Sequence, residues 1–134
     1  MPLVTEARRD GIEKRKQKIE KLEQLIEKIY EYRHWTDLFF QKFGLQKDVE
    51  PGQSPILHAR AIILIHFPQL KKEMDDLFVK SKDYELWCLE LGKKNLQKDQ
   101  VDIETARPFH KSYIYAEDTL LLKAIKLGRE ELKL

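Results

Sequence analysis

The amino-acid sequence predicts an all-α fold: an antiparallel bundle of four to five helices whose N-terminal helix is the longest. Apolar residues recur every three or four positions along most of the chain, and no segment alternates apolar and polar residues for long enough to predict a strand. The composition agrees, because 36% of the 134 residues are charged and there are only five glycines and five prolines. Such a mixture favours long helices over sheets.

The first predicted helix covers residues 5–43, with Thr5 as its N-cap and Gly44 as its C-cap. Its apolar residues form a coiled-coil-like seam with the a and d spacing of a heptad repeat. The N-terminal part of this seam consists of five aliphatic residues: Ile12, Ile19, Leu22, Ile26 and Ile29. Aromatic residues gather over residues 35–43, where they either complete a core or form a protein-binding patch.

The predicted length of this helix conflicts with a compact shape. A helix over residues 5–43 would be about 58 Å long. A compact globule of this chain length has a diameter of about 36 Å. We therefore expect either a break near residues 35–37 or a segment that projects from the body. The sequence divides accordingly into residues 1–18, named the arm below, and a helical bundle domain of residues 19–134. The arm would either meet a partner or fray in solution.

Proline and serine predict the next boundaries. Residues 45–53 are expected to form a loop, after which Ser54 and Pro55 mark the start of a second helix. This helix would continue to Phe67, because Pro68 either ends it or kinks it.

The rest of the chain contains three more apolar stripes. Residues 70–78 and 84–91 predict two helical segments, separated by a cap at Ser81 or Asp83, and Gly92 would end the second of them. After a polar connection, the last helix would begin at a cap on Asp102 and continue through Leu127, interrupted early by Pro108.

Positive charge is concentrated in the arm and just after it. The formal net charge of the whole chain is only +2, yet seven basic and three acidic residues lie between Arg8 and Lys21. The basic residues are Arg8, Arg9, Lys14, Arg15, Lys16, Lys18 and Lys21. On a projecting helix they predict one of two surfaces: one that contacts the phosphates of a nucleic acid, or a solvated face that binds protein.

The sequence favours a non-enzymatic protein–protein interaction module, such as an adaptor, assembly factor or regulator, that self-associates through its N-terminal helix. It contains no phosphate-cradling glycine loop, no nucleophile elbow and no zinc-spaced set of cysteine and histidine. We expect no metal and no cofactor, because Glu31 and His34 would supply only half of a di-iron bundle site.

A cytoplasmic location and no membrane partner are expected. The single cysteine, Cys88, cannot form an internal disulfide and is typical of a reducing compartment. No apolar stretch approaches the roughly 20 residues needed to span a bilayer. The N-terminus also lacks the charged-then-apolar layout of a signal peptide.

One pair of residues resembles an enzyme motif. Five residues separate Arg60 from His66, which resembles the Arg-x(4–6)-His motif of the HEPN-type ribonucleases. That family consists of small four-helix bundles that usually act as dimers. The resemblance implies that Arg60 would hold the scissile phosphate while His66 handles the 2′-hydroxyl proton. The residue after Arg60 is Ala61, where the family commonly has a polar residue. The alternative interpretation is a core helix with a histidine in its last turn.

Overall fold

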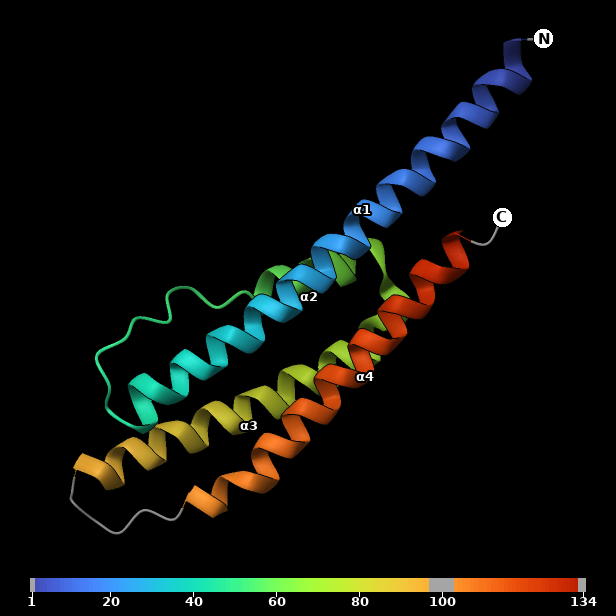
Figure 1. Ribbon diagram of the computed structural model, residues 1–134. Coiled ribbons are helices and arrows are strands. Elements are labelled where there is room, and N and C mark those ends of the chain that lie inside the picture. Colours follow the sequence, from blue (N-terminus) through green and yellow to red (C-terminus); the bar gives the residue numbers. More distant parts are fainter. Residues whose placement is uncertain (1, 97–102, 133–134) are drawn as a thin grey trace.

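The computed structural model describes the backbone of residues 2–96 and 103–132 and the side chains of residues 6–96 and 104–130. The regular elements within these ranges are all helical, which confirms the all-α prediction (Figure 1). The α-helices are α1 (Pro2–Phe39), α2 (Ile56–His66), α3 (Lys71–Leu96) and α4 (Arg107–Leu132). The shorter elements are a π-helical turn, η1 (Phe40–Gly44), and two 3₁₀ turns, η2 (Pro68–Leu70) and η3 (Ile103–Ala106).

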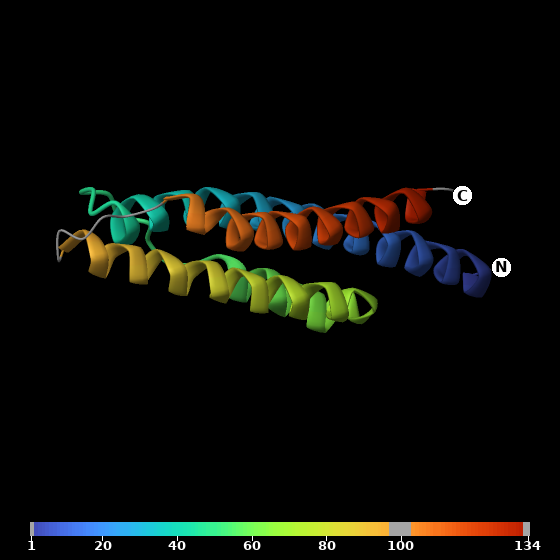
Figure 2. The same cartoon turned by 90° about the horizontal axis from the view of Figure 1, so that it is seen from below.

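Consecutive α-helices run in opposite directions (Figure 1). Figure 2 shows that they form two layers, α1 beside α4 and α2 beside α3. Apolar side chains from all four helices fill the space between the layers. Almost wholly buried examples, one from each helix, are Leu25, Ile63, Leu77 and Leu120. Burying a side chain of this size contributes about 1.5–3 kcal/mol, so this shared core holds the two layers together.

The first helix is continuous and long. Its 38 residues correspond to a length of about 57 Å. No break occurs at residues 35–37, where the Thr36 hydroxyl donates to the Arg33 carbonyl oxygen (2.8 Å) inside the helix. The helix begins at Pro2 rather than at Thr5, whose side chain lies outside the described ones. Its N-terminal part extends past the turn that joins α2 to α3 (Figures 1 and 2).

The second helix starts and stops close to the predicted positions. Ile56 is the first residue of α2, and its amide donates to the Ser54 hydroxyl oxygen at 3.4 Å. The helix ends at His66, and Phe67 leaves the helical region of backbone space with φ −135° and ψ 60°. Pro68 then opens η2, because it has no N–H with which to continue α2. The proline therefore ends the helix and does not kink it.

The prediction of two separate segments over residues 70–91 is wrong, since α3 is one helix of 26 residues. Ser81 is not a cap: its buried hydroxyl donates to the Phe78 carbonyl oxygen at 2.9 Å, which accommodates a serine in a helix interior. Gly92 does not end the helix either. A Cβ at this position would collide with the backbone carbonyl oxygen of Phe43, so the glycine permits close contact between α3 and η1.

The last helix begins at Arg107, with Pro108 in its first turn, where a missing N–H has no helical partner to lose. Residues 93–96 of the predicted polar connection belong to α3. The predicted cap Asp102 and residues 97–101 lie outside the described residues.

Candidate interaction surfaces

The predicted apolar seam of α1 divides into a buried half and an open half. Leu22 and Ile29 are 3% and 1% exposed in the chain's own core, and Ile26 packs against that core. Ile19 is half-buried, and Ile12 is 55% exposed. Of these five residues, those in and next to the arm are therefore the ones open to another molecule.

Cationic side chains surround Ile12 on its face of α1. They lie three and four residues before and after it, and residues with these spacings are neighbours on a helix. The cations are Arg8, Arg9, Arg15 and Lys16. Arg15 is half-buried and the other three are exposed. A second arm packed against this face would bring like charges together, so the face suits an acidic partner surface better than another arm.

The other lysines of the basic stretch share one face of α1, because Lys14, Lys18 and Lys21 are spaced four and three residues apart. Lys14 follows Ile12 by two residues, which is about 200° around an α-helix, so this face is opposite to that of Ile12. They line a groove of about 290 Å³ between α1 and the end of α2. The complete lining is Lys14, Gln17, Lys18, Glu20, Lys21 and His66. This groove collects positive charge at the base of the arm.

Arg60 and His66 face different neighbouring helices. The Arg60 guanidinium lies 4.8 Å from the centre of the Phe78 ring and 3.9 Å from the Asp75 carboxylate, both on α3. His66 instead lies against α1, across the lysine-lined groove. The fold thus directs the two side chains to separate surfaces, and the likeness to the HEPN-type ribonucleases rests on sequence spacing alone.

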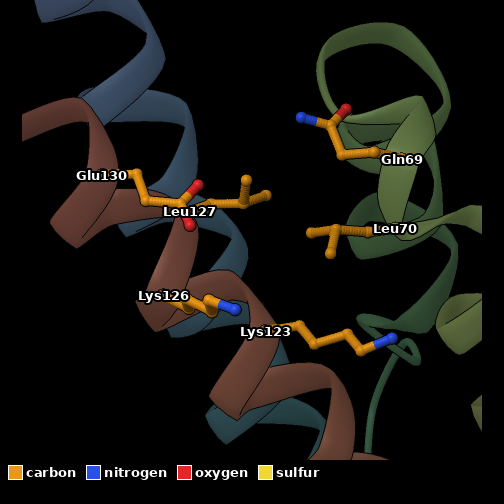
Figure 3. Close-up of a pocket in the computed structure, with 6 residues that line it drawn as sticks. All are labelled: Gln69, Leu70, Lys123, Lys126, Leu127 and Glu130. Atoms are coloured by element: carbon orange, nitrogen blue, oxygen red, sulfur yellow. The ribbon is translucent and has the colours of Figure 1, made fainter.

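A small pocket opens where η2 meets the C-terminal part of α4 (Figure 3). Figure 3 shows Leu70 and Leu127 pointing toward each other across it, with Lys123 and Lys126 along α4. Gln69 and Glu130 complete the lining. The volume is about 220 Å³. Sites for drug-sized ligands usually have about 300–1,000 Å³, so this pocket is too small for most organic cofactors.

A larger groove, of about 540 Å³, lies between α3 and α4. It is lined by Lys72, Glu73, Asp75, Asp76, Val79, Ala116, Thr119 and Lys123. Its three acidic residues come from the beginning of α3 and outnumber its two lysines, and the exposed Val79 side chain adds apolar surface. The groove therefore combines negative charge with an apolar part, as a counterpart to the basic face around Ile12.

The aromatic residues at the end of α1 form a row beside the loop of residues 45–55. The Trp35 ring lies between those of Tyr32 and Phe39, with centroid distances of 5.6 and 5.0 Å. Its indole N–H donates to the Gly52 carbonyl oxygen at 2.9 Å. Trp35 and Phe39 also pack against the core. The core and the loop therefore use much of the surface that the sequence left open as a protein-binding patch.

Two buried carboxylates connect α1 to α3 and α4. Glu117 of α4 accepts hydrogen bonds from Arg33 and Tyr113. Glu85 of α3 accepts one from the Tyr32 hydroxyl at 3.0 Å. Sequence reasoning did not single out either glutamate, because neither its neighbours nor its spacing differ from those of surface glutamates. The available signal was Arg33, a charged residue at an a position of a seam whose other a positions, Ile12, Ile19, Ile26 and Phe40, are apolar.

Burial and pairing shift the pKa values of Glu117 and Arg33. Burial raises the pKa of the Glu117 carboxyl, and the hydrogen bond from Tyr113 and the charge of Arg33 oppose this without cancelling it. Burial alone would lower the pKa of Arg33, but the hydrogen bond to Asp118 and the charge of Glu117 raise it overall.

Burial also raises the pKa of the Cys88 thiol to about 12. Cys88 is therefore a protonated, unreactive thiol at neutral pH.

Metal ligands are not grouped in the described part of the chain. There, no three histidine, cysteine, aspartate or glutamate side chains lie closely enough together to hold a metal ion. His34, the histidine of the Glu31–His34 spacing, is on α1 and does not join such a group. In the same part of the chain, no helix combines the length and apolarity that crossing a bilayer requires.

The exposed faces and grooves of the described residues are the structural basis for proposing a function. Comparisons with family models, curated proteins and solved structures found no significant match. The function proposed next therefore rests on residues and geometry alone.

Proposed function

We propose that this protein is a non-enzymatic helical interaction module that self-associates through its N-terminal helix. The observation that carries the proposal is the 55% exposure of Ile12, on an arm that extends past the turn between α2 and α3. Most helix stability in proteins comes from packing an amphipathic face. A projecting arm gains that stability when a second molecule covers it.

The outer face of α2 also supports an interaction role. Leu57, Leu64 and Ile65 are 63%, 47% and 72% exposed, and Ala61 lies between them at helical spacing. Scattered apolar residues on a surface need no explanation, but a contiguous stripe on one helix favours contact with another protein. An adaptor, assembly factor or regulator would use such faces without chemistry of its own.

Substituting Ile12 with lysine should weaken self-association. We expect the wild-type chain to be a dimer in sedimentation equilibrium, and Ile12→Lys to raise the dissociation constant at least tenfold, equivalent to about 1.4 kcal/mol. The cause is the loss of the apolar contact together with an added positive charge. Because Ile12 is exposed, the variant should keep the wild-type circular dichroism spectrum and melting temperature.

Leu96→Lys is the matched control, since it places the same charge at an exposed apolar position at the end of α3, on the opposite end of the bundle from the arm (Figure 1). This variant should dimerise like the wild type. A wild-type chain that stays monomeric at high micromolar concentration would remove the proposal, as would equal effects of the two substitutions.

A second candidate function is nucleic-acid binding through the basic arm. The observation that favours it is the gathering of Lys14, Lys18 and Lys21 with His66 around one groove. Phosphate contacts made by lysine are independent of base sequence and weaken as salt is added.

The nucleic-acid alternative predicts binding of short oligonucleotides of any sequence in fluorescence anisotropy. For single strands, the logarithm of the affinity should fall by about 0.7 for each phosphate contact per tenfold increase in salt. Replacing Lys14, Lys18 and Lys21 with glutamine should reduce both the affinity and this salt slope. An affinity that the triple substitution leaves unchanged would exclude this function.

A further inference from the structure

The groove between α3 and α4 contains a carboxylate that is only half satisfied. The Glu73 side chain is nine-tenths buried, with 10% exposed. Its Oε1 accepts a hydrogen bond from Lys123, whereas its Oε2 is buried and has no hydrogen-bond partner among the described residues. A buried polar atom left without a partner is unfavourable. Because the Oε2 atom is closed off from solvent, a cationic or N–H group that enters the groove supplies the missing hydrogen bond once the Glu73 carboxylate turns toward it.

The negative charge of the groove is available to such a group. The hydrogen bond from Lys123 holds the pKa of Glu73 below its usual range, so the carboxylate is ionised at neutral pH. Asp76 lines the same groove, about one helical turn further along α3, and is exposed. Asp75 and Glu73 each pair with a lysine of the same chain, Lys71 at 3.2 Å and Lys123 respectively. Asp76 has no ion pair among the described residues and Glu73 keeps one oxygen without a hydrogen bond, so these two are the acidic groups that a ligand would meet.

Apolar surface accompanies these two carboxylates. Val79 lies further along α3 and lines the groove with 55% of its surface exposed. Ala116 lines it from α4 but is only 2% exposed, so Val79 is the apolar side chain that a ligand would contact. A groove that combines an apolar part with acidic groups is suited to an amphipathic helix with basic flanks.

The arm has the complementary pattern. Its one described large apolar residue, Ile12, is surrounded by cations at the positions three and four residues away, as described above. The arm cannot occupy the groove of its own chain, because α1 is a continuous helix that carries it away from the body (Figure 1). A second copy is therefore needed to bring an arm and a groove together.

We propose that the arm of one copy docks, with its Ile12 face inward, in the groove between α3 and α4 of a second copy, where an arginine or lysine of the arm pairs with Glu73 and Asp76. This inference rests on the proposed self-association and specifies the surface that the N-terminal helix contacts. Each copy has one arm and one groove, so a mutual exchange of arms gives a closed dimer with two-fold symmetry.

Cross-linking tests the contact directly. A chain with Ile12→Cys is mixed with a chain carrying Val79→Cys and treated with a short bis-maleimide, one of the two chains bearing a mass tag. The native Cys88 is buried and should not react. We expect at least tenfold more mixed covalent dimer than with Leu96→Cys, at the exposed end of α3, in place of Val79→Cys. Equal yields from the two mixtures would overturn the proposal.

A charge exchange tests the pairing. Arg8→Glu with Arg9→Glu reverses charge on the arm, and Asp76→Lys reverses charge in the groove. Each variant alone should dimerise at least tenfold more weakly than the wild type. A mixture of the two should recover dimerisation, because each reversed arm then meets a groove of opposite charge. A mixture that stays monomeric while the wild type dimerises would overturn the groove assignment.

These outcomes separate the two proposals. A monomeric wild-type chain removes both of them. A dimer that Ile12→Lys dissociates and Asp76→Lys leaves intact keeps the proposed function and removes the groove. An arm that binds an oligonucleotide in a monomeric chain assigns the cations to phosphate contacts and also overturns the proposal.

Discussion

Gly92→Ala is expected to lower the free energy of unfolding by about 3 kcal/mol, at the upper end of the usual cost of overpacking. The added methyl group would collide with the backbone carbonyl oxygen of Phe43 and crowd the Gln46 side-chain amide. A backbone atom cannot rotate away as a side chain can, so α3 and η1 would have to separate. Urea unfolding followed by circular dichroism measures the change.

Gly11→Ala is the matched control, because it makes the same chemical change in the arm, where an added Cβ would meet nothing within 4 Å. Alanine is favoured over glycine in a helix interior by about 0.5–1 kcal/mol. We therefore expect helix content to rise slightly, with no loss of stability. If both variants were equally destabilised, close packing would not be the cause at Gly92.

Arg33→Met should destabilise the fold by about 3 kcal/mol at pH 7.5, because it leaves the buried carboxylate of Glu117 without its cationic partner. We take the lower end of the range for a broken buried pair, since the Arg33 side chain is 35% exposed and partly screened by solvent. The exposed pair between Lys93 and Glu90 gives the comparison, with side chains 70% and 64% exposed, and Lys93→Met should change stability by less than about 0.5 kcal/mol.

The effect of Arg33→Met should depend on pH with a defined sign. Because burial raises the folded-state pKa of Glu117 above its ordinary value of 4.5, the folded protein binds more protons than the unfolded chain between the two values. Its stability therefore decreases as pH rises through that window. Removing Arg33 raises the folded pKa further, so the cost of the substitution should shrink as the pH falls to about 4.5, where Glu117 takes up a proton.

Glu117→Gln in the Arg33→Met background tests this assignment. It should recover part of the lost stability at pH 7.5 and remove the additional pH dependence, because glutamine carries no charge to bury. Chemical unfolding at several pH values provides the comparison. If the cost of Arg33→Met were the same at pH 4.5 and pH 7.5, Glu117 would not be the group that responds.

Local patterns were enough to predict most of the helices. The spacing of apolar residues predicted α1, α2 and α4, and Pro68 ended α2 because its ring lacks the N–H that a continuing helix needs. The same reasoning failed within α3. Ser81 and Gly92 are typical of helix ends, but here a hydrogen bond to Phe78 and a close contact with Phe43 explain their presence inside the helix.

The candidate surfaces divide in a similar way. The basic face around Ile12 follows from sequence positions alone, because residues three and four apart are neighbours on any α-helix. The half-satisfied carboxylate of Glu73 could not be predicted. Its environment depends on Lys123, which is 50 residues away in the sequence.

The sequence by itself determined that this protein is helical, that its first helix is long, and that the arm carries a basic face, because these properties depend on neighbours within one or two turns. Tertiary structure alone decided which part of the seam became core and which glutamates were buried. Arg33 meets Glu117 across 84 residues of chain, and Tyr32 meets Glu85 across 53. Burial and pairing of this kind depend on how the helices pack, which no local pattern specifies.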